Sequence, residues 1–248
     1  MNTIYALWLR QVKKYFRSKS RIIGSLGQPV LFLVAFGFGF GPIYQKAGGG
    51  NYIDFLAPGI ILMSVLMTAM FSGIDIIWDR QFGFLKETLA APVSRMEIVL
   101  GKTLGAATVA LFQGVIVFIL SMLIGFRPQS VLAIIPAFGF SFLVAILFSS
   151  LGTAIASLLE DMQGFQLIMN FLVMPIIFLS GAYFPLDGLP RGMEIVTRLN
   201  PLSYGVDGLR GALSGVYAYN PRLDFIVLAA VATILLLVGS YLFSKIQI

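Results

Sequence analysis

Residues 103–126 read TLGAATVALFQGVIVFILSMLIGF, and this stretch contains no charged residue. Its length indicates the fold class, because a helix needs about 20 apolar residues to cross a hydrocarbon layer roughly 30 Å thick. An uncharged run of this length is typical of a transmembrane helix. The rest of the sequence is therefore interpreted as that of a membrane protein.

Five further runs of similar length lack Lys and Arg, at residues 22–41, 55–74, 131–159, 163–185 and 225–243. With 103–126 they predict an all-α integral membrane protein of six transmembrane helices, forming one domain over residues 1–248. Charged residues make up 11% of the chain, whereas a soluble domain averages about 25%. Pro175 interrupts the fifth run, and Gly181 and Pro185 end it early, which predicts a broken, re-entrant segment packed against protein.

Two residue types central to many active sites are missing, since the chain contains no Cys and no His. Thiolate and imidazole metal ligands, disulfides and a Ser–His–Asp triad are therefore excluded. Gly101-Lys102-Thr103 imitates the end of a phosphate-binding loop, but Met96 stands where that loop needs a glycine. We expect no enzyme activity, no metal site and no cofactor bound by this chain.

Basic residues outnumber acidic ones by 17 to 11. They concentrate before the first run and in the loop at 78–102. Because Lys and Arg in short loops stay preferentially in the cytoplasm, we expect both termini there. The positive charge is assigned to contact with anionic membrane lipid, and no nucleic acid partner is expected.

The segment 1–21 is predicted to form a basic amphipathic helix. Its apolar residues recur at spacings of three and four, which places them on one helical face. Such a helix lies in the membrane interface with its aromatic face in the acyl boundary. It acts either as a plain anchor or as a surface that also contacts a cytoplasmic partner. The face consists of Leu7, Trp8, Val12, Tyr15 and Phe16.

The loop at 78–102 is the only sizeable segment between two spans that is predicted to lie in the cytoplasm. Phe82, Leu85 and Leu89 keep helical spacing, which predicts a short helix lying across the membrane face. Pro92 halts that helix, and Ser94 is placed to cap the next one. The apolar stripe fits a groove on a partner protein.

On the outer side, residues 186–222 are predicted to be largely helical, with Leu202, Val206, Leu209 and Leu213 forming an apolar stripe. Asp207 and Arg210 are three positions apart, which predicts a local ion pair. The segment is either a cap on the bundle or a lid that lines an exit.

The predicted spans also lack the ionisable residues that ion-coupled transporters place near the bilayer centre. Asp54 and Asp75 lie at opposite ends of the second run, and no other ionisable residue enters a span. This pattern argues against an ion-coupled or passive transporter, which remains the alternative interpretation.

Two segments together resemble the ABC-2-type transporter permeases, in particular members that export drugs, lipids or polysaccharides. The first is FGFLKETLAAPVSR at 82–95, followed by IVLGK at 98–102. The second comprises FLSG at 178–181, FPL at 184–186, NPLSY at 200–204 and DGLR at 207–210. With the six spans and the basic amphipathic start, the resemblance covers essentially the whole chain.

The resemblance implies a permease subunit without its own ATPase, paired with a separate ABC ATPase that binds ATP and Mg²⁺. It also implies a second permease copy, forming a homodimer in the plasma membrane of a prokaryote. The substrate would be amphiphilic, drug-like, lipid-linked or a polysaccharide, and it would leave the cell.

The resemblance further assigns roles to two sets of residues. One set would contact the ATPase, with residues 87–95 forming a helix in its cleft and the amphipathic helix bracing the contact from the side. The other would lie near the exit and the dimer axis. The first set is Phe82, Leu85, Glu87, Leu89, Pro92 and Arg95; the second is Gly181, Pro185, Pro201, Tyr204, Asp207 and Arg210.

Overall fold

The structure is a computed structural model that describes residues 3–46, 50–186 and 188–246. Within these ranges the chain is helical and contains no strand. The elements in chain order are α1 (Thr3–Arg17), α2 (Lys19–Lys46), α3 (Tyr52–Phe71), α4 (Ile74–Gln81), α5 (Phe84–Ala90), α6 (Arg95–Ile124), the 3₁₀ turn η1 (Val131–Ala133), α7 (Ile134–Leu158), α8 (Met162–Phe178), α9 (Arg191–Leu199), α10 (Pro201–Ser214) and α11 (Pro221–Ser244).

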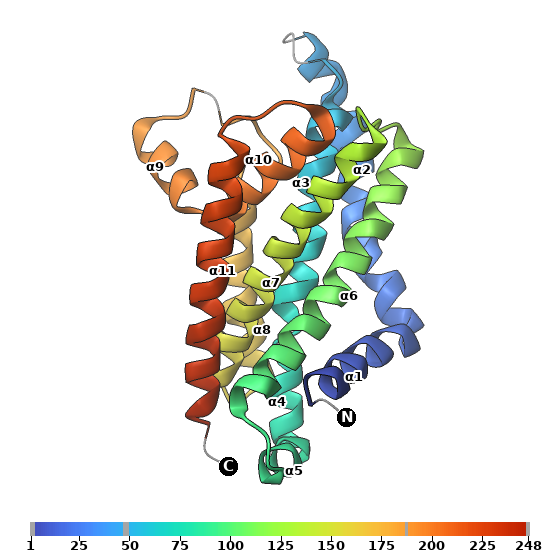
Figure 1. Ribbon diagram of the computed structural model, residues 1–248. Coiled ribbons are helices and arrows are strands. Elements are labelled where there is room, and N and C mark those ends of the chain that lie inside the picture. The colour runs from blue at the N-terminus through green and yellow to red at the C-terminus, as the bar shows by residue number, and fades with distance from the viewer. Residues whose placement is uncertain (1–2, 47–49, 187, 247–248) are drawn as a thin grey trace.

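The long helices run alongside one another as a bundle, and the short helices cover its two ends (Figure 1). One end carries α1, α5 and the C-terminal end of α11, and we call it the α5 end. The opposite end carries α9 and α10, and we call it the α9 end. The first and last helices thus reach the same end of the bundle.

Five helical segments in the described residues are long and apolar enough to cross a membrane. Each corresponds to a predicted run, namely those at 22–41, 55–74, 103–126, 131–159 and 225–243. The segments are α2, α3 with α4, α6, η1 with α7, and α11.

In the run at 163–185, α8 has 17 residues and ends at Phe178, so the helix stops before Gly181 and Pro185 as predicted. That length reaches about 25 Å. The predicted interruption at Pro175 is wrong, because Pro175 lies inside α8. The chain then turns through Gly181, whose φ is 75°, and Ala182 and Tyr183 are buried in the bundle. A Cβ on Gly59 of α3 would lie 2.2 Å from the carbonyl oxygen of Ala182, so this glycine makes room for the turn.

The centre of the bundle is α3. Of its most apolar part 72% is buried, against 17% for α2 and for α11. α3 also touches α7 backbone to backbone, since a Cβ on Gly152 would lie 2.2 Å from the Met70 carbonyl oxygen. The outward faces of α2 and α11 are left to contact lipid or another chain.

Three predicted boundaries are corrected. The amphipathic helix predicted at 1–21 ends at Arg17, and 19–21 already belong to α2; residues 1–2 lie outside the described part. The loop predicted at 78–102 is shorter and comprises residues 82–94, because residues 78–81 belong to α4 and residues 95–102 belong to α6. The outer segment at 186–222 contains α9 and α10, its last two residues begin α11, and residue 187 is not described.

Candidate functional site

The α5 end contains a cluster of charged side chains that three helices contribute. α4 supplies Asp75 and Asp79, both about 95% buried. Arg10 of α1 donates two hydrogen bonds to the Asp79 carboxylate, at 2.9 and 2.6 Å. Lys14, one turn further along α1, pairs with Asp75 at 2.6 Å. Matching pairs four residues apart therefore bind α1 to α4.

The third helix is α6, which contributes Lys102. Its side chain is 4% exposed, and its ammonium group forms an ion pair with the same Asp79 carboxylate. The hydrogen bond to Asp79 and the carboxylate charge raise the pKa of the Arg10 guanidinium above its ordinary value. We call these five residues the charge cluster: Arg10, Lys14, Asp75, Asp79 and Lys102.

The charge cluster also contacts α5. The Arg10 guanidinium lies 3.8 Å from the centre of the Phe84 ring, a cation–π contact. Leu85, the next residue, is fully buried in the core of the chain. Arg10 therefore contacts α4 and α5 at once.

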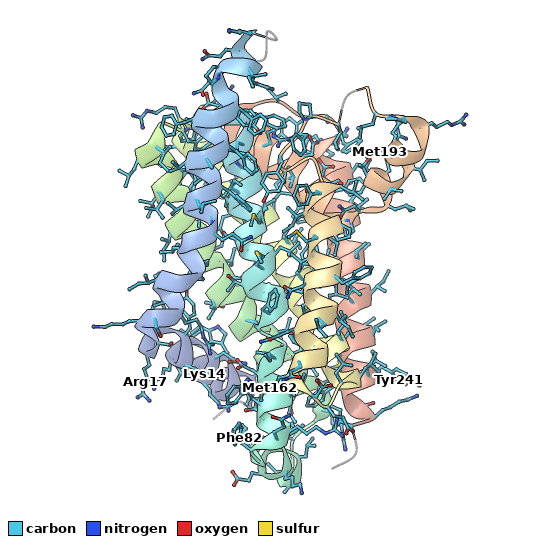
Figure 2. All side chains as sticks on the ribbon, turned by 180° about the vertical axis from the view of Figure 1, so that it is seen from behind. Lys14, Arg17, Phe82, Met162, Met193 and Tyr241 are labelled. Carbon is cyan, nitrogen blue, oxygen red and sulfur yellow. The ribbon has the colours of Figure 1, made fainter. Side chains whose placement is uncertain are left out.

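An exposed aromatic pair marks the tip of the α5 end. Trp78 of α4 stacks on Phe82 with ring centres 5.1 Å apart, and they are 42% and 71% exposed. Figure 2 shows Phe82 near this end of the bundle, beyond Lys14. Lys86 and Glu87 of α5, which follow Phe82 closely in the sequence, are also exposed. This tip offers an apolar pair next to charged groups.

The predicted stripe of Phe82, Leu85 and Leu89 is not one exposed face. Phe82 follows α4, and Gly83 at φ 80° separates it from α5. Leu85 is buried and Leu89 half-buried. The break at Gly83 changes the helical phase, which a stripe counted through it cannot show.

The remaining predicted contact residues lie between α5 and α6. Pro92 is exposed in the connection. Ser94 caps α6 as predicted, in a capping box with Glu97. Arg95 donates to the carbonyl oxygen of Ile246 at 3.2 Å, so it holds the connection against the C-terminal end of the chain.

The apolar face of α1 packs on α6, which corrects the prediction that it rests in the acyl boundary. Leu7 and Tyr15 are buried, Trp8 and Val12 half-buried and Phe16 exposed. A Cβ on Gly101 or Gly105 of α6 would lie 2.9 or 2.6 Å from the Cβ atoms of Leu7 and Gln11, respectively. These two glycines form the groove that accepts α1.

Hydrogen bonds fix the register of α1 on α6. The Trp8 indole donates to the Thr108 hydroxyl at 3.0 Å. The Tyr15 hydroxyl donates to the Gln113 amide oxygen at 2.6 Å. α1 is thus an integral part of the α5 end.

At the α9 end, Asp207 and Arg210 form no direct ion pair, so that prediction is wrong. Asp207 accepts hydrogen bonds from the backbone N–H groups of Ala218 and Tyr219, at 2.7 and 2.8 Å. Arg210 donates to the carbonyl oxygen of Gly181 at 2.8 Å. Each side chain is satisfied by a different backbone segment.

The other predicted outer residues lie at the contacts of Asp207 and Arg210 or at the ends of neighbouring segments. Tyr204 packs its ring against that of Tyr219, 5.4 Å between centres, and so lies near the Asp207 contact. Arg210 stacks on the Phe55 ring of α3 at 3.9 Å. Pro201 begins α10, and Pro185 is exposed after the buried turn.

Comparison with known proteins identifies the group to which this geometry belongs. Residues 2–214 match the ABC-2 type transporter family. The chain belongs to the ABC-2 type transporter family. The match runs from α1 to the end of α10, and it confirms the resemblance found in the two sequence segments.

Relatives cover most of the chain. Nodulation protein J of Rhizobium leguminosarum bv. viciae is 28% identical over 97% of this chain and 93% of its own. The protein named transport permease ycf38 of Pyropia yezoensis is 32% identical over 86% of this chain and 74% of its own. The corresponding ycf38 protein of Cyanophora paradoxa is 29% identical over 80% of this chain and 71% of its own.

The family and the apolar helices together make the chain a multi-pass membrane protein. An ABC-2 permease in general works with an ABC ATPase partner. The described residues contain no group of three or more Asp or Glu side chains that could hold a metal ion.

The charge cluster was not found from the sequence. Two signals were present: basic residues four apart at 10 and 14, and acidic residues four apart at 75 and 79. Lys102 was placed in a loop, because the uncharged run begins immediately after it. Asp79 meets Arg10 and Lys102 only in the folded bundle, which brings α1, α4 and α6 together.

Proposed function

We propose that the chain is the transmembrane permease subunit of an ATP-driven ABC exporter, and that a separate ATPase docks on the α5 end. The observation that carries the proposal is the exposed Trp78–Phe82 pair beside α5, joined through Arg10 to the charge cluster. A partner that grips this tip moves α5, and the cluster carries the motion to α1, α4 and α6.

The arrangement in the membrane follows from the same proposal. α8 serves as the sixth span, and both termini lie in the cytoplasm with the basic α5 end, in the plasma membrane of a prokaryote. Two copies of the chain form a homodimer, and ATP and Mg²⁺ bind on the ATPase subunits.

The substrate class proposed is an amphiphilic, drug-like, lipid-linked or polysaccharide molecule that is moved out of the cell. The uncharged interior of the spans supports this class over a small ion. The buried acids and Lys102 lie toward the ends of the helices, and those of the charge cluster are engaged in ion pairs. A proton or cation relay across the bilayer therefore lacks ionisable steps.

Purification of the tagged chain from native membranes in mild detergent tests the proposal. We expect an ATP-binding protein to accompany it in about equal amount, and the pair to move substrate only with ATP. Recovery of the chain alone, with solute movement in vesicles without ATP, would instead establish the alternative of an ion-coupled or passive transporter.

A further inference from the structure

A cavity of about 390 Å³ lies between α1, α2, α3 and α6. Its volume is within the range of small-molecule sites. It adjoins the charge cluster, since Asp75 is part of its wall. The lining residues that matter for its chemistry are Gln11, Arg21, Gln28, Met67, Phe71 and Asp75.

The cavity presents hydrogen-bonding groups that the protein leaves unused. Gln11 of α1 is only 7% exposed, and its side-chain amide forms no hydrogen bond with the described part of the chain. The Gln11 amide is not among the fully buried unpaired atoms of the described residues, so it is open to the cavity, where it can both donate and accept hydrogen bonds. Gln28 of α2 brings a second amide to the same wall. A ligand in the cavity can therefore hydrogen-bond to both amides.

One positive charge at the cavity wall is left without an ion-pair partner among the described acidic residues. Only two charged residues line it, Arg21 and Asp75. Asp75 is neutralised by Lys14 at 2.6 Å. Arg21 is exposed at the start of α2 and makes no ion pair with a described acidic residue. An anionic group at the cavity would therefore meet an available guanidinium.

The other side of the cavity is apolar. Met67 and Phe71 of α3 and Val109 of α6 form this wall. α2 forms one side of the cavity and lies at the periphery of the bundle, with 17% of its most apolar part buried. A hydrocarbon chain can reach the apolar wall from the lipid along this helix.

We infer that the cavity binds one anionic amphiphile of the membrane, with its head at Arg21 and Gln11 and its hydrocarbon chain against Met67 and Phe71. A membrane phospholipid and a lipid-linked export substrate share this chemistry. Either one would join α1 to α2 and α3 across the break at Ser18, next to the charge cluster.

The test uses the full chain without an ATPase, so its failure leaves the proposed function intact. Detergent-purified protein is titrated with phosphatidylglycerol or phosphatidylcholine, and bound lipid is counted by native mass spectrometry. We expect one tight phosphatidylglycerol per chain. Arg21→Gln should weaken its binding about tenfold, as expected for loss of one charge-assisted contact.

Lys19→Gln is the matched control, because Lys19 is equally basic, exposed and in the first turn of α2 but does not line the cavity. Gln11→Leu should also weaken binding. Equal retention in the Arg21 and Lys19 variants would overturn the inference, as would equal binding of the two lipids by the unaltered chain.

The ligand carried from native membranes identifies the source. Release of an ordinary anionic phospholipid, in an amount that Arg21→Gln reduces, indicates a structural lipid. Release of a larger anionic amphiphile that ATP removes from the complete transporter indicates the export substrate. A chain that retains only neutral lipid contradicts the inference.

Discussion

Asp79 is the residue on which the α5 end depends, because it holds Arg10 and Lys102 at the same time. Lys102 is 4% exposed, and a buried ammonium group needs a counter-ion. Removing one partner of a buried pair leaves the other uncompensated, at a cost of about 3–5 kcal/mol. The pair therefore constrains the structure even where replacement of both partners would be tolerated.

Asp79→Ala is predicted to lower the melting temperature of the detergent-solubilised protein by about 10 °C, since it leaves Lys102 buried and unpaired. Glu194→Gln is the control. It breaks the Arg198–Glu194 pair of α9, in which both side chains are largely exposed, and such pairs contribute at most about 1 kcal/mol. Equal melting of the two variants would show that the Asp79 pairs do not stabilise the chain.

At this scale the sequence predicts local contacts better than distant ones. Ser94 as the cap of α6 follows from its neighbours alone, and the structure confirms it. The Asp207–Arg210 pair also looked local but is replaced by bonds to residues 181 and 218–219. Those partners are brought together by tertiary packing, which spacing along one helix does not encode.

At the scale of elements, the contact between α1 and α6 depends on two glycines. Gly101 and Gly105 leave space that Leu7 and Gln11 occupy. The sequence predicted α1 as an amphipathic helix, because its apolar period is strong. It did not predict the receiving surface, since glycines in an apolar run are common in membrane helices.

Gly105→Leu should displace α1, because even a Cβ at this position would lie 2.6 Å from the Gln11 Cβ. We expect a loss of about 1–3 kcal/mol of stability and faster proteolysis within α1. Gly39→Leu in α2 is the control, as no atom lies within 4 Å of its added Cβ. If both variants resist protease equally, the packing of α1 on α6 is not as described.

The whole molecule leaves a polar stripe uncovered on α8. Gln163, Gln166 and Asn170 are exposed, and their spacing puts them on one helical face. Amide groups are costly against lipid, so a second copy of the chain or a water-filled pathway should cover them. The uncovered stripe supports the proposed homodimer.

Because the chain has no Cys, a single introduced cysteine reports one position only. Asn170→Cys is predicted to form a disulfide-linked dimer in native membranes under mild oxidation. Ile234→Cys on the exposed face of α11 should remain monomeric. Dimers through position 234 and none through position 170 would place the second copy against α11 and contradict an interface at α8.

Five of the six predicted spans correspond to membrane-capable segments, because an uncharged run of that length has few alternatives. For the run at 163–185, the sequence predicts the early end but places the interruption at Pro175, which α8 contains without a break. What the sequence does not predict is where the turn at Gly181 packs, namely with Ala182 in close approach to Gly59. Such an approach exists in the folded bundle and not in either segment alone.

The most direct test of the central claim is a cross-link from the exposed tip of the α5 end. Phe82→Cys, carrying a photoactivatable thiol reagent, is irradiated in native membranes, and Phe171→Cys on the exposed face of α8 is the control. We predict that position 82 captures an ABC ATPase and that position 171 does not. Capture of no ATP-binding protein at position 82, in a chain that still transports, would contradict the account.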